Sequence, residues 1–102
     1  MSRVVAYVPD LMDRSKVAAA AGGDCVFASR PGDLAALSAG ADVVVVDLTK
    51  PGVVEVLAGL DARVIGFANH TSRDVMDAAR AAGCEQVLPR SDFFARIDEL
   101  LA

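Results

Sequence analysis

Five polar side chains occupy positions in this 102-residue sequence where chemistry can be expected. They are Asp10, Asp13, Asp47, His70 and Arg90. Carboxylates bind hard cations such as Mg²⁺, a guanidinium holds a carboxylate or phosphate in bidentate fashion, and an imidazole titrates near neutral pH. All except Asp13 closely follow short apolar blocks, so they form a site if the fold brings the ends of those blocks together. The other interpretation is that they mark points where strands meet solvent, since Asp readily begins turns.

The apolar blocks have the pattern of strands. They are short, rich in β-branched residues and apolar on successive positions, which is typical of strands buried on both faces of a parallel sheet. The predicted strands are Arg3–Val8, Asp24–Ala28, Asp42–Asp47, Arg63–Phe67 and Gln86–Leu88.

Segments rich in Ala and Leu separate the strands and predict five helices, with Gly, Pro and Ser at their ends. The predicted helices are Asp10–Ala21, Pro31–Ala39, Gly52–Leu60, Ser72–Ala82 and Asp92–Ala102, the last with Ser91 as its N-cap. In the last helix the apolar residues fall on one face, which we expect to pack on the sheet. They are Phe93, Phe94, Ile97, Leu100 and Leu101.

Five strands that alternate with five helices, joined by right-handed crossovers, predict an α/β fold. We expect a flavodoxin-like (βα)5 three-layer sandwich, with a parallel five-stranded sheet in the order 2-1-3-4-5, formed by residues 1–102 as one domain without an output domain. In such sheets ligands bind beyond the carboxyl ends of the strands, at the switch point between the first and third. Asp10, Asp47, Arg90 and His70 are therefore expected to meet at this edge.

Composition limits the classes of function. The net charge of −4 and the scattered Lys and Arg residues argue against a nucleic-acid partner. No apolar run approaches the length of a membrane span and no secretory signal is recognisable, so we expect a cytoplasmic protein with no membrane contact. Cys25 and Cys84 lie far apart and form no CxxC motif, which favours reduced, buried cysteines over structural zinc.

One stretch of the sequence is similar to a known family. Val43–Gly52 reads VVVVDLTKPG, an apolar strand that ends in Asp47 and is followed by Pro51 four residues later. Three features follow downstream: an Ala-Ala-Gly turn at residues 81–83, a strand that ends at a basic residue, and an amphipathic helix. In this layout the chain resembles the receiver domain of response regulators in two-component signal transduction.

The resemblance implies roles for the polar residues. Asp47 matches the phosphoacceptor, and Arg90 takes the place of the family's lysine. Asp10 with Asp47 and, less well matched, Asp13 would hold Mg²⁺.

The sequence also departs from the family pattern. Only Asp10 fits the acidic pair after the first strand, Ala68 stands where the family has Thr or Ser, and Val87 replaces the aromatic switch residue. Arg90-Ser91 replaces Lys-Pro. These differences predict an atypical receiver or pseudo-receiver, with Mg²⁺ bound weakly or not at all and phosphorylation of Asp47 impaired or absent, so that its status as a phosphoprotein is doubtful.

We therefore expect a stand-alone signalling domain that acts through protein–protein contacts and is not an enzyme beyond autophosphorylation from a phosphodonor. Its contact face would comprise the fourth helix, fifth strand and fifth helix, and the partner would be another protein or a second copy, giving a monomer or homodimer. His70 would be either a loop residue that faces water or a partner of Asp47 in place of the missing hydroxyl.

The alternative is a small-ligand-binding or minor enzymatic domain that uses Asp10, Asp47, His70 and Arg90. The chain has no GxGxxG motif, no P-loop and no corrinoid Asp-x-His-x-x-Gly run. The loop Pro9-Asp10-Leu11-Met12 is acidic and apolar, which is unsuited to a flavin phosphate, and it holds no cysteine for a phosphocarrier.

Overall fold

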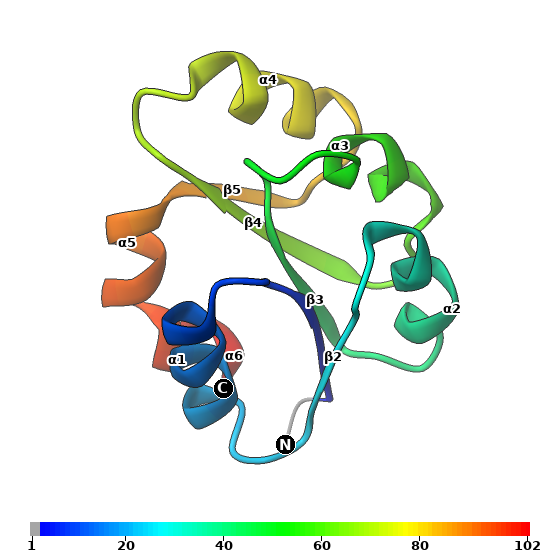
Figure 1. The fold of residues 1–102 in the computed structure, drawn as a ribbon, viewed down its shortest axis with the longest axis vertical. Helices are drawn as coiled ribbons and strands as arrows, with labels where there is room; N and C mark the ends of the chain where they lie inside the picture. Colours follow the sequence, from blue (N-terminus) through cyan, green and yellow to red (C-terminus); the bar gives the residue numbers. More distant parts are fainter. Residues whose placement is uncertain (1–2) are drawn as a thin grey trace.

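Five parallel strands form the central sheet of the computed structural model, which describes residues 3–102 (Figure 1). Their order is β2-β1-β3-β4-β5. The strands are β1 Val4–Tyr7, β2 Cys25–Phe27, β3 Val43–Asp47, β4 Arg63–Ala68 and β5 Gln86–Pro89. The predicted flavodoxin-like α/β arrangement with strand order 2-1-3-4-5 is thus confirmed; residues 1 and 2 of the expected domain lie outside the described residues.

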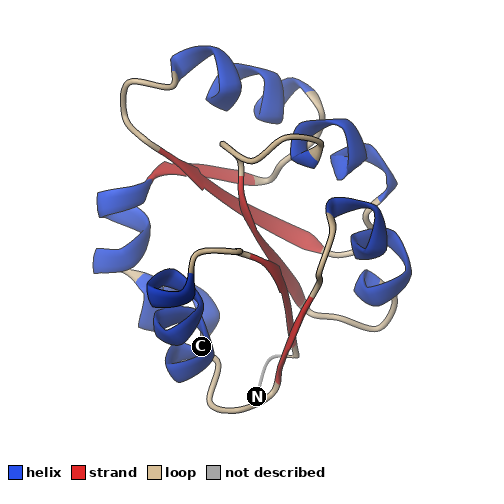
Figure 2. Cartoon of the chain, viewed as in Figure 1, coloured by secondary structure: helices blue, strands red, loops and turns tan. Residues whose placement is uncertain are grey.

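Helices cover both faces of the sheet (Figures 1 and 2). On one face lie α1 Leu11–Ala20, α5 Arg90–Ala95 and α6 Ile97–Leu101. On the other lie α2 Leu34–Ser38, preceded by the 3-10 turn Pro31–Asp33, then α3 Val53–Val56 with the 3-10 turn Leu57–Gly59, and α4 Arg73–Ala81. Among residues 3–102, no helix has the length and apolar character needed to cross a membrane.

The central strand β3 shows how the two layers are packed. All five of its residues are buried, and alternate side chains point to opposite faces. Val43 and Val45 enter the core beneath α1, α5 and α6, whereas Val44 and Val46 enter the core beneath α2, α3 and α4. By the same alternation Asp47 belongs to the α1 and α5 side, which decides which helices can reach its carboxylate.

A close contact fixes the chain just after Asp47. The side chain of Leu48 is buried and lies over Gly66 in the middle of β4. A Cβ at Gly66 would come within 2.7 Å of Leu48 Cγ. Gly66 therefore provides the space that lets the chain turn tightly as it leaves β3.

The expectation of burial on both faces holds for the inner strands only. Residues of the edge strands β2 and β5 are mostly half-buried, because each edge strand has a neighbour on one side alone. Cys84 is buried as expected, but Cys25 in β2 is only partly buried.

The prediction of one continuous last helix that begins after Ser91 is wrong. The helix begins at Arg90, directly after Pro89, whose φ of −57° suits a helix start. It then breaks at Arg96, where φ is −111° and the N–H bonds to the carbonyls of Asp92 and Phe93. Both halves still face the sheet: Phe93, Leu100 and Leu101 are buried, and Phe94 and Ile97 pack against them.

The other helices are shorter than predicted. Ser72 occupies the N-cap position of α4, but its side chain makes no capping hydrogen bond. The second and third helices keep only one or two α-helical turns, because their ends tighten into 3-10 turns.

Candidate functional site

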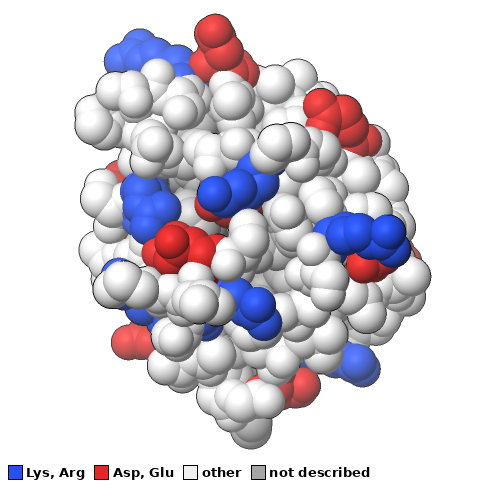
Figure 3. All heavy atoms as spheres, viewed as in Figure 1, with Lys and Arg blue, Asp and Glu red and all other residues white. Residues whose placement is uncertain are grey.

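A polar pocket opens where the carboxyl ends of β1, β3, β4 and β5 meet, and has a volume of about 330 Å³. We call it the edge pocket. It is lined by Asp10, Asp13, Asp47, Thr49, Lys50, Ala68, Asn69 and Arg90. Figure 3 shows acidic and basic side chains side by side near the middle of the face it draws, with no large area of one sign. The structure therefore brings Asp10, Asp47 and Arg90 together, as the strand ends predict, and adds Asp13 from α1.

Asp47 lies buried at the end of β3, with 4% of its surface exposed. Its Oδ1 accepts hydrogen bonds from the backbone N–H of Thr49 at 3.0 Å and from the Thr49 hydroxyl at 2.6 Å. One oxygen of the carboxylate is thus held by the turn that follows the strand. A nucleophile must have a lone pair free for attack, so only Oδ2 is left to serve this purpose.

Asp10 caps helix α1. Its Oδ1 accepts the N–H of Asp13 at 3.0 Å, the usual way in which an aspartate satisfies a free N–H in the first helical turn. The bond from the Asp13 N–H holds the pKa of the Asp10 carboxyl below its usual value, because the ionised form is the better acceptor.

Asp13 and Arg90 form an ion pair across the pocket. Arg90 Nη2 lies 2.8 Å from Asp13 Oδ1, and the two side chains are 41% and 5% exposed. The guanidinium also lies over the rings of Phe67 and Phe94, at 5.6 and 5.2 Å from their centroids, a favourable position for a cation. Arg90 is therefore held by an internal carboxylate.

The three aspartates of the edge pocket are each engaged by a group of the protein itself. Asp10 binds a helix N–H, Asp13 binds Arg90 and Asp47 binds Thr49. In the described part of the chain no group of three or more His, Cys, Asp or Glu side chains is placed to hold one metal ion. Three aspartates against one lysine and one arginine leave the pocket with a formal charge of −1.

His70 does not join this pocket. It is exposed and lines a second depression, of about 430 Å³, which we call the α4 pocket. The α4 pocket is lined by His70, Arg73, Met76, Asp77, Arg80 and Pro89. Asn69 lines the edge pocket while the next residue, His70, lines the α4 pocket, so the idea that His70 serves Asp47 has no geometric support.

Three pocket residues were missed by sequence reasoning: Thr49, Lys50 and Asn69. A signal for Thr49 was present, because Asp-x-Thr is a pattern in which the Asp side chain caps its own turn. Asp13 was counted only as a weak metal ligand. Its pairing with Arg90, 77 positions away, could not be deduced from spacing.

The positions that depart from the receiver pattern can now be placed. Ala68 lines the edge pocket and supplies no hydroxyl there. Val87 is half-buried against the core beneath α4. Val75 and Phe94 are half-buried and Met76 is buried, so these apolar side chains do not form an exposed patch on the expected contact face.

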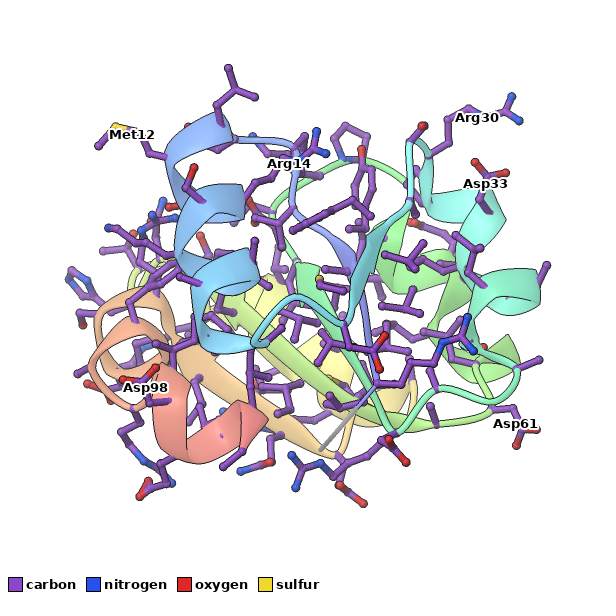
Figure 4. All side chains as sticks on the ribbon, turned by 90° about the horizontal axis from the view of Figure 1, so that it is seen from below. Met12, Arg14, Arg30, Asp33, Asp61 and Asp98 are labelled. Carbon is purple, nitrogen blue, oxygen red and sulfur yellow. The ribbon has the colours of Figure 1, made fainter. Side chains whose placement is uncertain are left out.

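The exposed apolar side chains lie elsewhere. Leu11 and Met12, at the start of α1, are 76% and 73% exposed, and they stand between the pocket residues Asp10 and Asp13. Figure 4 shows Met12 pointing away from the domain. These two side chains are therefore open to contact with a partner.

No protein-family model matches this chain, and no curated protein matches it either.

Proposed function

We propose that this chain is an atypical receiver-like signalling domain that works through protein contacts, with phosphorylation of Asp47 impaired or absent. The observation that carries the proposal is the set of internal bonds in the edge pocket. Asp47 stands at the end of the central strand, where the receiver resemblance puts a phosphoacceptor, yet Thr49 holds one of its oxygens and Asp13 holds Arg90.

The groups that line the pocket support the same proposal. Phosphoryl transfer depends almost wholly on positioning and on cations that stabilise the developing charge. A phosphodonor would enter a pocket in which the guanidinium of Arg90 is already paired with Asp13 and Ala68 offers no hydrogen bond, which leaves Lys50 as the one lining cation without an ion pair among the described residues. The pocket residues therefore give the transferred group less stabilisation than the family pattern would.

The test is incubation with acetyl phosphate and Mg²⁺, followed by intact mass measurement. We expect no stable gain of a phosphoryl group, and amide spectra with beryllofluoride that match those without it. Asp47→Asn is the control. A mass gain that disappears in Asp47→Asn would show a working receiver and overturn the proposal.

The contact surface is the second part of the proposal. The α4–β5–α5 face is the one that the resemblance implies, but Leu11 and Met12 on α1 are the exposed apolar residues that support a contact best. Sedimentation velocity of the purified protein shows whether it binds a second copy of itself or stays monomeric, as expected if the partner is another protein. If the protein self-associates through α1, Leu11→Ser with Met12→Ser gives a monomer, whereas Val26→Ser, at the exposed position of β2, does not.

The competing function is a small-ligand site at the edge pocket. It is favoured by the volume of about 330 Å³ and by Lys50, but not by His70, which lies outside. Amide shifts at Thr49 and Asn69 during titration with a small ligand would favour this function over the signalling proposal.

A further inference from the structure

The α4 pocket differs in charge from the edge pocket beside it. Two arginines and one aspartate give it a formal charge of +1 with His70 neutral, although the chain as a whole carries −4. Exposed charges more than about 8 Å apart are largely screened at physiological salt. The charges near this pocket therefore matter more for its ligands than the net charge of the chain, and besides the lining groups they include Asp74, the exposed neighbour of Arg73.

Helix α4 positions the charged groups. Arg73, Asp77 and Arg80 are four and three residues apart, a spacing that sets all three side chains along one side of the helix. Arg80 Nη1 lies 3.1 Å from Asp77 Oδ1. Arg73 makes no ion pair with any residue from 3 to 102 and is exposed, so its guanidinium is available to a ligand.

The rest of the pocket is apolar or able to donate a hydrogen bond. Met76 is 7% exposed and, with half-buried Pro89, gives the pocket an apolar wall. His70 offers a ring N–H beside the arginines. A volume of about 430 Å³ lies within the range of small-molecule sites, in which apolar walls and a few polar groups combine.

We propose that the α4 pocket binds a small organic anion, with a carboxylate or phosphate group on Arg73 and Arg80 and an apolar part against Met76 and Pro89. Guanidinium groups hold both kinds of oxyanion in bidentate fashion. The site is separate from Asp47, so it goes beyond the signalling function proposed above and does not depend on phosphorylation.

The probes are phenyl phosphate, benzoate and inorganic phosphate, titrated into ¹⁵N-labelled protein. The first two share a ring and differ in the anion, and the third lacks the ring. We expect saturable shifts of the α4 amides and the Arg73 and Arg80 side chains, with phenyl phosphate binding more tightly than inorganic phosphate because the ring contacts Met76 and Pro89. Benzoate tests whether a carboxylate serves as well as a phosphate.

Arginine variants identify the side chains that hold the anion. Arg73→Gln and Arg80→Gln should each weaken binding of phenyl phosphate about tenfold, as expected for the loss of one charge-assisted hydrogen bond. Arg30→Gln is the matched control. Arg30 is exposed and forms an ion pair with Asp33, three residues away, as Arg80 does with Asp77. Figure 4 shows Arg30 and Asp33 pointing outward.

Asp77→Asn should instead tighten binding several-fold, since it removes the carboxylate that competes for Arg80. All four substitutions are at exposed positions, and thermal unfolding checks that each variant folds. Shifts that do not saturate, or equal losses in Arg30→Gln, would overturn the proposal. Shifts centred on Thr49 would also overturn it and place the anion in the edge pocket. The acetyl phosphate test on Asp47 has its own readout, so failure of one proposal leaves the other standing.

Discussion

Burial sets the chemistry of single residues in this domain, most plainly at the two cysteines. Desolvation raises the pKa of Cys25 to about 11 and also raises the pKa of Cys84. The Cys84 thiol lies 3.3 Å from the carbonyl oxygen of Gln86. Because the thiolate is the reactive form, both residues are expected to behave as small apolar side chains.

The first prediction follows from these pKa values. In Cys84→Ala, which leaves Cys25 as the single thiol, the rate of labelling by an aromatic disulfide at pH 8 should be about one-hundredth of the rate in the unfolded chain. Labelling with and without guanidinium chloride measures the ratio. Equal rates in the two states would contradict the raised pKa of Cys25.

At this scale sequence reasoning found the charged residues at the strand ends but not the bonds that they make. Asp10, Asp47 and Arg90 follow apolar blocks, and the rule for parallel sheets was enough to bring them to one pocket. The bond between Asp13 and Arg90 joins positions far apart in the chain, and its formation depends on how α1 and α5 pack. Nothing in the spacing of either residue reports that packing.

At the scale of elements, the Asp13–Arg90 ion pair connects α1 to the start of α5. The two side chains differ in exposure, since Asp13 is almost fully buried and Arg90 is 41% exposed. Removing Arg90 leaves a buried carboxylate without its cation, whereas removing the charge of Asp13 leaves an arginine that can turn to water.

The second prediction is therefore an asymmetry in stability. Arg90→Ala should lower the free energy of unfolding by about 2 kcal/mol, between the values for exposed and buried pairs. Asp13→Asn should lower it by less, and adding Asp13→Asn to Arg90→Ala should restore part of the loss. Urea unfolding measures all three. Arg30→Ala is the control, because its exposed pair with Asp33 should contribute little. A larger loss in Asp13→Asn than in Arg90→Ala would contradict the reasoning.

The third prediction concerns the cap of α1. The pKa of Asp10 is lowered in the folded state by the N–H of Asp13, so the folded protein binds fewer protons at this group than the unfolded chain. The carboxylate then stabilises the fold above its ordinary pKa of 3.8, and the contribution is lost as the pH falls through the lowered folded value. Asp10→Asn still caps the helix but does not titrate.

Urea midpoints of the wild type and of Asp10→Asn, measured from about pH 6 down to about pH 2, test this. The advantage of the wild type should be full at the upper end and disappear in acid. A difference between the two proteins that stays constant with pH would show that the cap does not depend on charge.

Elements were predicted best where one physical signal dominates. The β-branched blocks predicted all five strands to within one residue at each end, because strands of a parallel sheet appear as short, continuous apolar runs. The last helix was predicted less well. Its apolar face extends through Arg96 without interruption, and the break there appears in the backbone angles, not in the pattern of residue types.

At the scale of the whole molecule, side-chain packing holds β3 closely against β4. Leu48, the residue after Asp47, fills the space above Gly66 in β4. The strand order itself was predictable, since right-handed crossovers leave few topologies open. The separation of polar residues into two pockets of opposite charge was not, because it depends on how single residues point after each strand ends.

The fourth prediction tests the contact between β3 and β4. Gly66→Ala should lower the free energy of unfolding by about 1–3 kcal/mol, because the added Cβ would overlap the Leu48 side chain. Gly59→Ala is the matched control: a Cβ there would meet nothing within 4 Å and its φ is not positive, so stability should be unchanged or slightly higher. Thermal unfolding of both variants gives the comparison, and equal stabilities would argue against the close contact.

The walls shared by the two pockets have a consequence for how this chain can change over time. Asn69 and His70 are consecutive, as are Pro89 and Arg90, and in each pair one residue lines the edge pocket and the other the α4 pocket. Surface loops usually accept insertions and deletions freely. Here a single residue gained or lost between β4 and α4 would change the side chains offered to the two pockets, and one gained between Pro89 and Arg90 would also displace α5 from the core. The length of the loop between β4 and α4 therefore bears on both pockets at once, whereas the junction of β5 with α5 is already fixed by the fold.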